Sequence, residues 1–291
     1  AILEKVVKDI DPNLIIHLAA ESHVDRSIDN PLNFIESNII GTFNLLEATR
    51  AYWEEISDIK KNLFRFIHIS TDEVFGTLGL KGKFDENTKY SPRSPYSSSK
   101  AASDHLVQSW HHTYGLPTII SNCSNNFGPY QFPEKLIPLS ILKGIKGENI
   151  PLYGNGSNIR DWLYVEDHVD ALLLIAEKGK VGKSYCIGGF GEKTNKEVQL
   201  QICNLLDKVK PKEFPHSDLI KNVADRPGHD KRYSINSNLI QKELGWTPKI
   251  TFEDGLEKTI NWYVDNLEWS DSIMKKSGYS GYRIGKTKEV Q

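Results

Sequence analysis

The sequence has few cysteines and no long apolar segment, and these absences exclude several classes of protein. Its three cysteines, Cys123, Cys186 and Cys203, are odd in number and far apart, so neither a disulfide framework nor a CxxC zinc site fits them. No apolar run approaches the roughly 20 residues that span a bilayer, and no secretory signal pattern opens the chain. We therefore expect a cytoplasmic protein with no metal site and no membrane segment.

The chain also lacks an excess of charge of either sign. Its 36 basic and 38 acidic residues give a formal net charge of -2, so nothing favours nucleic acid or an anionic membrane as a partner. The hydrophobic content of 38% and the charged content of 25% are typical of a globular protein. A chain of 291 residues can bury a sizeable core without disulfides or metals.

Short apolar strands alternate with helical patterns in the first half of the chain. We expect strands at Leu14 to Leu18, Phe64 to Ile69 and Thr118 to Asn122, and helices from Pro31 to about Trp53 and from Tyr96 to Tyr114. Continuous apolar strands separated by helices indicate a parallel sheet with helices on both faces. The predicted fold is therefore an α/β Rossmann-like sheet.

A change of character after Gly128-Pro129 divides the chain. We expect residues 1–126 to form the Rossmann-like domain, and residues 127–291 to form mainly a smaller C-terminal lobe with segments that return to the first domain. Further helices are expected from about Glu166 to Lys178, from Asn195 to Val209 and from Phe252 to Asn266. The mostly polar tail from Leu267 to Gln291 is expected to be partly loose.

Tyr96 and Lys100 form the first candidate chemical pair. They are four residues apart at the start of a predicted helix, which places both side chains on one helical face. A free tyrosine is a poor base at neutral pH, but a nearby ammonium favours the phenolate and lowers the pKa. The pair can take a proton from a substrate hydroxyl, as hydride transfer from an alcohol requires. A lone YxxxK match is often a surface accident, so its context decides.

That context is the end of the preceding strand. Thr71 can hydrogen-bond the same hydroxyl, and Asp72 and Glu73 follow it directly. Ligands of open α/β sheets bind at the carboxyl ends of the strands. Two adjacent carboxyl groups there can act as an acid and a base if their pKa values are pushed apart. An acidic turn or a helix cap is the alternative reading of the same residues.

A series of motifs gives these residues a family. In order and spacing, the chain resembles dTDP-glucose 4,6-dehydratases of the extended short-chain dehydrogenase/reductase family, from Leu14 to about Tyr233. The stretches that carry the resemblance are HLAAESHVDRS, STDEVFG, YSSSKAASDHL, NCSNNFGPYQFPEKLIP, RDWLYVEDH and DRPGHDKRY. The acid pair after Thr71 separates the dehydratases from the related 4-epimerases. Members of this family usually pair through two helices, so the resemblance also implies a homodimer.

The resemblance implies a reaction and roles for the residues. Tyr96, helped by Lys100 and Thr71, would deprotonate the 4-hydroxyl while C4 gives a hydride to NAD. Glu73 would then remove the C5 hydrogen, and Asp72 would protonate the 6-hydroxyl so that water leaves. The hydride would return to C6, which gives a 4-keto-6-deoxy sugar nucleotide. The rival interpretations are a dehydratase or decarboxylase of a UDP- or GDP-sugar, and a non-catalytic sugar-nucleotide binding protein.

The resemblance also assigns the binding residues. The residues expected to touch NAD are Leu18, Ala19, Ala20, Glu21, Ser22, Ser37, Tyr96, Lys100 and Asn126. The residues expected to touch the sugar nucleotide are Ser22, Thr71, Asn125, Lys135, Leu136, Pro151, Leu152, Tyr153, Arg160, Asn195, Arg226 and His229. Arginine suits this role because its guanidinium binds phosphate oxygens in pairs.

One expected motif is absent. The glycine-rich dinucleotide fingerprint should precede the first strand seen here, but the chain opens on the helical run AILEKVVKDI with no Met. We expect roughly two βαβ units, each of on the order of 30 residues, to be missing from this sequence. On this expectation the full-length protein is the enzyme, and residues 1–291 made alone would not bind NAD tightly.

Overall fold

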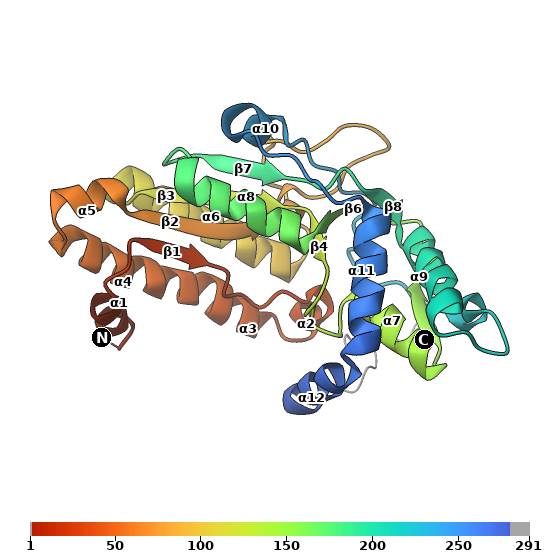
Figure 1. Ribbon diagram of the computed structural model, residues 1–291. Helices are drawn as coiled ribbons and strands as arrows, with labels where there is room; N and C mark the ends of the chain where they lie inside the picture. The colour runs from red at the N-terminus through yellow and green to blue at the C-terminus, as the bar shows by residue number, and fades with distance from the viewer. Residues whose placement is uncertain (1, 280–291) are drawn as a thin grey trace.

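The computed structural model describes residues 2–279, and a four-stranded parallel sheet lies at its centre (Figure 1). The strands are β1 (Leu14–His17), β2 (Arg65–Thr71), β3 (Thr118–Cys123) and β7 (Ser184–Ile187), in the order β1-β2-β3-β7. All three pairings are parallel. The predicted Rossmann-like sheet is confirmed, and β2 extends beyond the predicted strand to include Thr71.

Helices cover both faces of this sheet, as the alternating pattern predicted (Figure 1). On one face lie α1 (Ile2–Ile10), α4 (Gly41–Glu55) and α6 (Pro95–Tyr114), and on the other lie α8 (Val165–Lys178) and α10 (Asn238–Leu244). Successive strand residues point to opposite faces. Phe66 and Ile120 therefore pack in the apolar core under α1, α4 and α6, whereas Ile67 and Ile119 pack in the core under α8 and α10.

The helix that follows Pro31 is continuous but not uniform. It comprises α3 (Pro31–Phe34), a π-helical turn η1 (Ile35–Ile40) and α4. Such π turns inside α-helices are rare and are frequent at functional sites. Here the turn buries Asn38 while Ser37 stays exposed. The short helices α2 (Val24–Asp29) and α5 (Asp58–Leu63) precede and follow this run.

A second group of elements lies beyond the carboxyl ends of the strands (Figure 1). It contains two small sheets, β4 (Asn125–Phe127) with β6 (Ile159–Tyr164) and β8 (Glu192–Thr194), and β5 (Ile150–Tyr153) with β9 (Ile220–Val223). Helices α7 (Leu136–Lys146), α9 (Asn195–Val209) and α11 (Phe252–Asp265) share one apolar core with β4 and β6. Two single turns, η2 (Asp72–Phe75) and η3 (His216–Leu219), also belong to the described elements.

The prediction of a loose tail from Leu267 was wrong for its first part. Residues Leu267–Ser277 form helix α12. Leu267, Trp269 and Met274 pack against the lobe core, and the ring of Trp269 lies 5.1 Å from that of Trp262. These three apolar side chains bury enough surface to hold the helix, although most residues of the segment are polar. The predicted loose segment from residue 280 onward lies outside the described residues.

No helix within residues 2–279 is both long and apolar enough to cross a bilayer.

Gly189, two residues after β7, packs directly against the main chain of β6. A methyl group at this position would overlap the main-chain carbonyl oxygen of Trp162. Because a main-chain atom cannot swing aside like a side chain, Gly189→Ala is expected to lower the free energy of unfolding by about 3 kcal/mol or more. Urea unfolding measures this. Gly79→Ala is the matched control, since no atom lies within 4 Å of a methyl group there, and an equal loss in both variants would contradict the prediction.

Candidate active site

The chemical residues gather where β2 ends. Thr71 is the last residue of β2, and Asp72 and Glu73 form the turn η2 directly after it. The Thr71 hydroxyl accepts a hydrogen bond of 3.2 Å from the Glu73 main-chain N–H, which caps the turn. The cap sends the two acids in different directions. Asp72 is 1% exposed, whereas Glu73 lines a cavity.

Tyr96 and Lys100 reach the same place from the first turns of α6. The helix starts here because Ser94 and Ser97 form a capping box and Pro95 occupies the first turn. Both side chains are buried on one face, as their spacing predicted. The Tyr96 phenol shares a hydrogen bond with the Thr71 side chain and feels the charges of Glu73 and Asp72. The acids and the phenol therefore converge.

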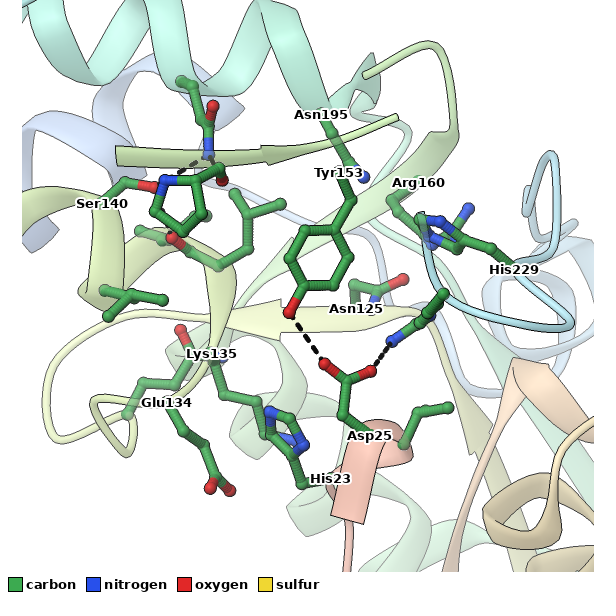
Figure 2. A pocket seen from close by; sticks show the side chains of 18 of the residues that line it. His23, Asp25, Asn125, Glu134, Lys135, Ser140, Tyr153, Arg160, Asn195 and His229 are labelled. Carbon is green, nitrogen blue, oxygen red and sulfur yellow. Dashed lines mark hydrogen bonds and ion pairs between the residues drawn. The ribbon is translucent and has the colours of Figure 1, made fainter. Parts of the chain in front are cut away.

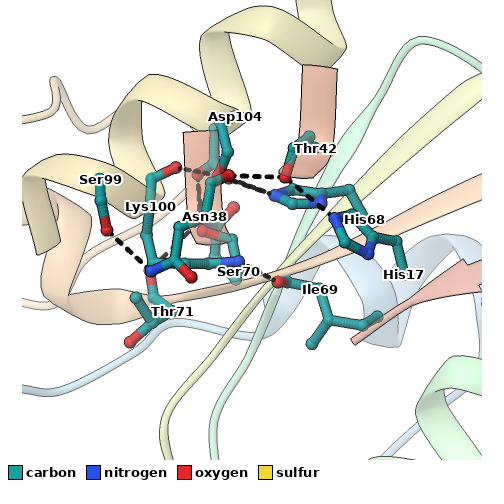
Figure 3. A network of polar contacts seen from close by, with 12 residues as sticks. His17, Asn38, Thr42, His68, Ile69, Ser70, Thr71, Ser99, Lys100 and Asp104 are labelled. Carbon is teal, nitrogen blue, oxygen red and sulfur yellow. Dashed lines mark hydrogen bonds and ion pairs between the residues drawn. The ribbon is translucent and has the colours of Figure 1, made fainter. Parts of the chain in front are cut away.

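The Lys100 ammonium does not act on the phenol in the expected way. It donates a hydrogen bond of 2.8 Å to the main-chain carbonyl of Ile69 (Figure 3). Burial, followed by the negative charge of Glu73, raises the pKa of Tyr96 well above its ordinary value, and burial lowers the pKa of Lys100. Tyr96 is therefore a protonated phenol in this structure, and it needs a further positive charge nearby to become a base.

The two acids differ in their environment. Burial, with the neighbouring charge of Glu73, raises the pKa of Asp72 well above its usual range, and one oxygen of Asp72 is buried without a hydrogen-bond partner among the described residues. Burial also raises the pKa of Glu73, but the cations Arg226, Arg160 and Lys135 oppose this. Asp72 is the better proton donor of the pair and Glu73 the better acceptor.

The environment of Asp72 gives a stability prediction. A raised carboxyl pKa means that the folded state disfavours the charged form, so its cost is absent below the unfolded pKa and grows as pH rises toward the folded pKa. Asp72→Asn removes the charge at nearly constant shape. We expect the variant to have the higher Tm at pH 8, by about 2–4 °C for each kcal/mol gained, and no advantage near pH 3. Calorimetry at both values is the check, and a lower Tm at pH 8 would contradict the prediction.

A buried polar network supports α6 from beneath (Figure 3). The Asp104 carboxylate accepts hydrogen bonds from the Ser70 hydroxyl at 2.6 Å and the Tyr90 phenol at 2.9 Å. His68 Nε2 lies 3.2 Å from its other oxygen. Because Asp104 is on the helix and Ser70 on β2, the network fixes the helix carrying Tyr96 against the strand that ends at Thr71.

His17 and His68 lie in this network and are buried core residues. Burial lowers the pKa of His17 to about 3 and that of His68 to about 4, so both are neutral at pH 7. Their Nε2 atoms contact the hydroxyls of Thr42 at 2.9 Å and Ser103 at 3.2 Å. Each hydroxyl already donates to a main-chain carbonyl, so each Nε2 carries the donated hydrogen. Neither Nδ1 atom has a partner among the described residues.

The predicted cofactor residues outside α6 and β4 lie on the loop after β1 and on the π-helical turn. The loop after β1 carries Leu18 to Ser22, and Asn38 holds it: the Asn38 amide pairs with both main-chain groups of Glu21, at 2.8 and 3.0 Å, and donates to Ser99 on α6 at 2.8 Å. Leu18 is 62% exposed, so this loop is open to a ligand. Ser37 is exposed on the π-helical turn and makes no contact with the catalytic group among the hydrogen bonds of the described residues.

All the predicted substrate residues except Thr71 line one cavity (Figure 2). They are Ser22, Asn125, Lys135, Leu136, Pro151, Leu152, Tyr153, Arg160, Asn195, Arg226 and His229. Glu73 and the predicted cofactor residue Asn126 line it too. The cavity lies between the loop after β1 and the second group of elements, and seven separate segments line it together with Glu73.

The walls of this cavity carry charges of both signs and several unpaired polar atoms. Its cations are Lys135, Arg160 and Arg226, and its acids are Asp25, Glu73 and Glu134. The three cations all contribute to the charge around Glu73, and Arg160 is held by the carbonyls of Ile159 at 2.8 Å and Asp230 at 3.0 Å. Buried polar atoms without partners among the described residues include Asn125 Oδ1, Asn126 Oδ1, Asn195 Oδ1 and Arg226 Nε. Hydroxyl or N–H groups of a polar ligand would satisfy the three amide oxygens, and an anionic oxygen would satisfy Arg226 Nε.

A family model described as GDP-mannose 4,6 dehydratase matches residues 1–259. The chain belongs to this family. It is similar to the dTDP-glucose 4,6-dehydratase of Xanthomonas campestris pv. campestris, with 51% identity over 99% of this chain and 82% of that protein. It is also similar to dTDP-glucose 4,6-dehydratase 1 of Escherichia coli K12, with 54% identity over 95% of this chain and 78% of that protein.

Solved structures of the dehydratases share the fold. The chain superimposes on dTDP-glucose 4,6-dehydratase of Bacillus anthracis in complex with NAD with a TM-score of 0.81, 44% identity and coverage of 94% of this chain and 79% of that one. The enzyme of Streptomyces venezuelae with NAD and TDP bound gives a TM-score of 0.84 at 39% identity, with the same coverage. A UDP-glucose 4-epimerase of Thermus thermophilus gives 0.80 at 25% identity, over 91% of this chain and 81% of that one.

Residues that the sequence reasoning missed also line the cavity of this family member. Asp25, Gln131, Glu134 and Gln199 belong to it, and Asn38 and Asp104 stand behind it. Asp25 lies inside a motif that carried the family resemblance, but no residue spacing singled it out. Asn38 follows the predicted Ser37 directly. A polar residue that becomes buried only through tertiary contacts gives no periodic signal in sequence.

Proposed function

We propose that the protein converts dTDP-glucose to the 4-keto-6-deoxy sugar nucleotide by eliminating water across C5 and C6. One observation carries this proposal: Tyr96, Asp72 and Glu73 converge beside a cavity that three basic side chains line. The phenol suits a proton on oxygen, and the two carboxyl groups suit the proton and hydroxyl that leave as water. The named relatives are dTDP-glucose 4,6-dehydratases, in agreement with this chemistry.

The first task of the site is to take the proton of the 4-hydroxyl. Tyr96 is the acceptor, Thr71 shares its hydrogen bond, and Lys100 holds its ammonium at the carbonyl of Ile69, one turn along the same helix face. A phenol with a raised pKa stays protonated at neutral pH and cannot accept a proton, so Tyr96 acts only once positive charge beside it favours the phenolate. Oxidation at C4 then makes the hydrogen on C5 acidic, because a ketone stabilises the neighbouring carbanion.

The second task is to remove water. Glu73, whose carboxylate lines the cavity and faces three cations, takes the C5 proton. Asp72, with the higher tendency to hold its proton, gives that proton to the 6-hydroxyl as the C–O bond breaks. The proton removed from C5 and the proton donated at O6 balance, so each carboxyl group ends in the other's form. Glu73, whose proton exchanges with solvent, returns a proton to C5 when the double bond is reduced. Both carboxyl groups are then ionised, and the proton that Tyr96 took from the 4-hydroxyl passes through solvent to restore the protonated form of Asp72.

The residues at the strand ends fit NAD. The open loop of Leu18 to Ser22 and the unpartnered buried Asn126 Oδ1 offer contacts to a dinucleotide at the carboxyl ends of β1 and β3. Tyr96 and Lys100 would lie at its reactive end. When bound, NAD supplies a hydride acceptor for C4 that later returns the hydride to C6, and a positive charge beside the phenol. The structural relatives bind NAD in their own structures.

The lining of the cavity suits the nucleoside diphosphate part of the substrate. We assign the base to the walls formed by Leu136, Pro151 and Leu152, which are apolar residues of the lining. Arg160 and Arg226 suit the diphosphate because guanidinium groups bind paired oxygens. Asn125 and Ser22 are nearest in the chain to the catalytic strand ends and suit the hexose. His229 is neutral at pH 7, since burial lowers its pKa to about 4.

The assay of purified protein with sugar nucleotides tests this function. With NAD and dTDP-glucose we expect the alkali-induced absorbance of a 4-keto sugar, and at least tenfold less with UDP-glucose or GDP-mannose at equal concentration. A signal from UDP-glucose or GDP-mannose alone would overturn the assignment of the base. No signal from any substrate, together with tight binding of TDP, would favour the non-catalytic alternative.

Two further parts of the proposal concern assembly. We propose a homodimer that pairs through the helices after Pro31 and after Tyr96, supported by their exposed apolar residues Ile35, Phe43 and Tyr114, which are 46%, 39% and 43% exposed. We also propose a cytoplasmic location, supported by three buried free cysteines. In this arrangement residues 1–126 supply the cofactor side and residues 127–291 mainly the substrate side.

A further inference from the structure

Asp25 is a buried acid in the wall of the cavity, and the reaction proposed above gives it no role. It lies in the first turn of α2, is 3% exposed and lines the cavity. Its two oxygens have different partners (Figure 2): the Tyr153 phenol donates to one at 2.9 Å, and Arg226 Nη1 donates to the other at 3.3 Å. A buried carboxylate is retained only where such partners offset its desolvation.

The partners of Asp25 come from one small sheet. Tyr153 ends β5, and it pairs in register with Val223 at the end of β9, three residues before Arg226. Asp25 itself follows the loop of Leu18 to Ser22 on the cofactor side. The carboxylate therefore joins the cofactor side to β5 and to the loop that follows β9 on the substrate side.

Two neighbouring contacts make the same connection. Lys135 donates to the carbonyl of Ser22 at 2.6 Å, and Arg26 forms an ion pair with Glu134 at 2.7 Å. Ser22, Asp25 and Arg26 are thus each held by the substrate side. Asp25 is the member of this segment that forms an ion pair with a cation lining the cavity.

The geometry of Arg226 shows what this contact achieves. A guanidinium carries five N–H donors in one plane, so fixing one nitrogen sets the direction of the others. Asp25 fixes Nη1, and Arg226 Nε is buried without a partner among the described residues. Burial acts to lower the pKa of Arg226, but the charges of Asp25 and Glu73 outweigh it and raise the pKa. The side chain is held as a cation with a donor unused.

We propose that Asp25 is a positioning residue that orients Arg226, and with it Tyr153, to receive the diphosphate of the nucleotide substrate. The inference rests on the proposed function for the identity of the ligand. Asp25 carries negative charge and does not itself contact the diphosphate. It acts through Arg226. This distinguishes it from a residue that only packs at the boundary between the cofactor side and the substrate side.

A double-mutant cycle on TDP binding tests the inference. Isothermal titration calorimetry with TDP is carried out on the unaltered protein, Asp25→Asn, Arg226→Gln and the double variant. We expect D25N to weaken TDP binding about tenfold, as loss of one charged contact of about 1.4 kcal/mol would do, and R226Q at least as much. In the R226Q background, D25N should change the affinity by less than about twofold, because its effect passes through the missing guanidinium.

Two controls separate this inference from simpler outcomes. Asp9→Asn makes the same chemical change at an exposed position of α1 and should leave TDP affinity unchanged. If D25N does not fold, Asp25→Ser, which keeps an acceptor oxygen, takes its place in the cycle. In steady-state assays KM for dTDP-glucose should rise with the TDP dissociation constant, while kcat falls far less.

The outcomes distinguish the inference from the function on which it rests. If the unaltered protein does not bind TDP, the proposed function fails. If it binds TDP and D25N binds equally well or more tightly, the positioning role is overturned. Losses of TDP affinity that multiply in the double variant would also overturn it. They would show that Asp25 acts through general packing at the boundary between the two sides.

Discussion

Replacing Tyr96 by Phe is expected to lower kcat for the 4-keto product by at least about 10²-fold, the lower end of what a general acid-base group contributes. The change removes one oxygen from a buried site and leaves the ring contacts, including the edge-on contact with Phe34. Binding of TDP should stay within about twofold, because the phenol is not a lining residue of the cavity. Product formation by the alkali-absorbance assay and TDP titration are the two measurements.

The matched control for this variant is Tyr114→Phe. Tyr114 lies on the same helix, α6, but is 43% exposed and uses its ring rather than its hydroxyl, with Arg50 stacked over it at 4.7 Å. Its loss of hydroxyl should leave kcat unchanged. If the Tyr96→Phe variant kept more than a third of the normal kcat, the phenol would have no part in the reaction, and the two acids would lack the proposed partner.

Replacing Glu73 by Gln is expected to have the second large effect, a loss of about 10²–10⁴ in kcat. The amide keeps the shape but cannot take the C5 proton. The unaltered enzyme should lose activity as pH falls, since Glu73 must be ionised to act and burial raises its pKa above the ordinary value. In the Glu73→Gln variant this loss of activity at low pH, the acid limb of the pH profile, should be absent from the residual rate.

The same change elsewhere on the surface serves as the control. Glu257→Gln alters an exposed residue of α11 and should change neither kcat nor the pH profile. A pH profile for Glu73→Gln that keeps its acid limb would assign that limb to another group. Retained product formation at the normal rate would show that Glu73 is not the base.

The main sheet could be predicted because its signals are local. Continuous apolar strands, the helix between Asn195 and Val209 and the start of α6 at Pro95 depend on neighbouring residues in the sequence, and the structure reproduces them within a few residues. The small sheets were not predicted. Their strands β4, β5, β8 and β9 have three or four residues each, too few to show a period, and their pairing is decided by distant partners.

The catalytic group was visible in sequence for a related reason. Thr71, Asp72 and Glu73 follow a predicted strand, and Tyr96 and Lys100 share a helix face, so two local rules placed them at one sheet edge. The pKa of Tyr96 could not be inferred from that spacing. The expected lowering by Lys100 assumed an exposed pair, whereas burial and Glu73 dominate in the folded protein.

Asp25, Asn38 and Asp104 illustrate the limit of sequence reasoning. Each is a polar side chain that the fold buries to 3% exposure or less, and each joins segments far apart in the chain. Asp25 connects to Arg226, 201 residues later. Contacts of this kind depend on how sheet and lobe pack, and no local pattern reports that.

The proton at C5 offers the most direct test of the account, because Glu73 is assigned both to remove it and to return one. Purified protein is incubated with NAD and dTDP-glucose in D₂O, and the product is analysed by NMR, with isolated product in D₂O as the measure of spontaneous exchange. The account predicts one deuterium at C5 beyond that background, and none in the residual product of Glu73→Gln. A product from the unaltered protein with hydrogen retained at C5 would contradict it.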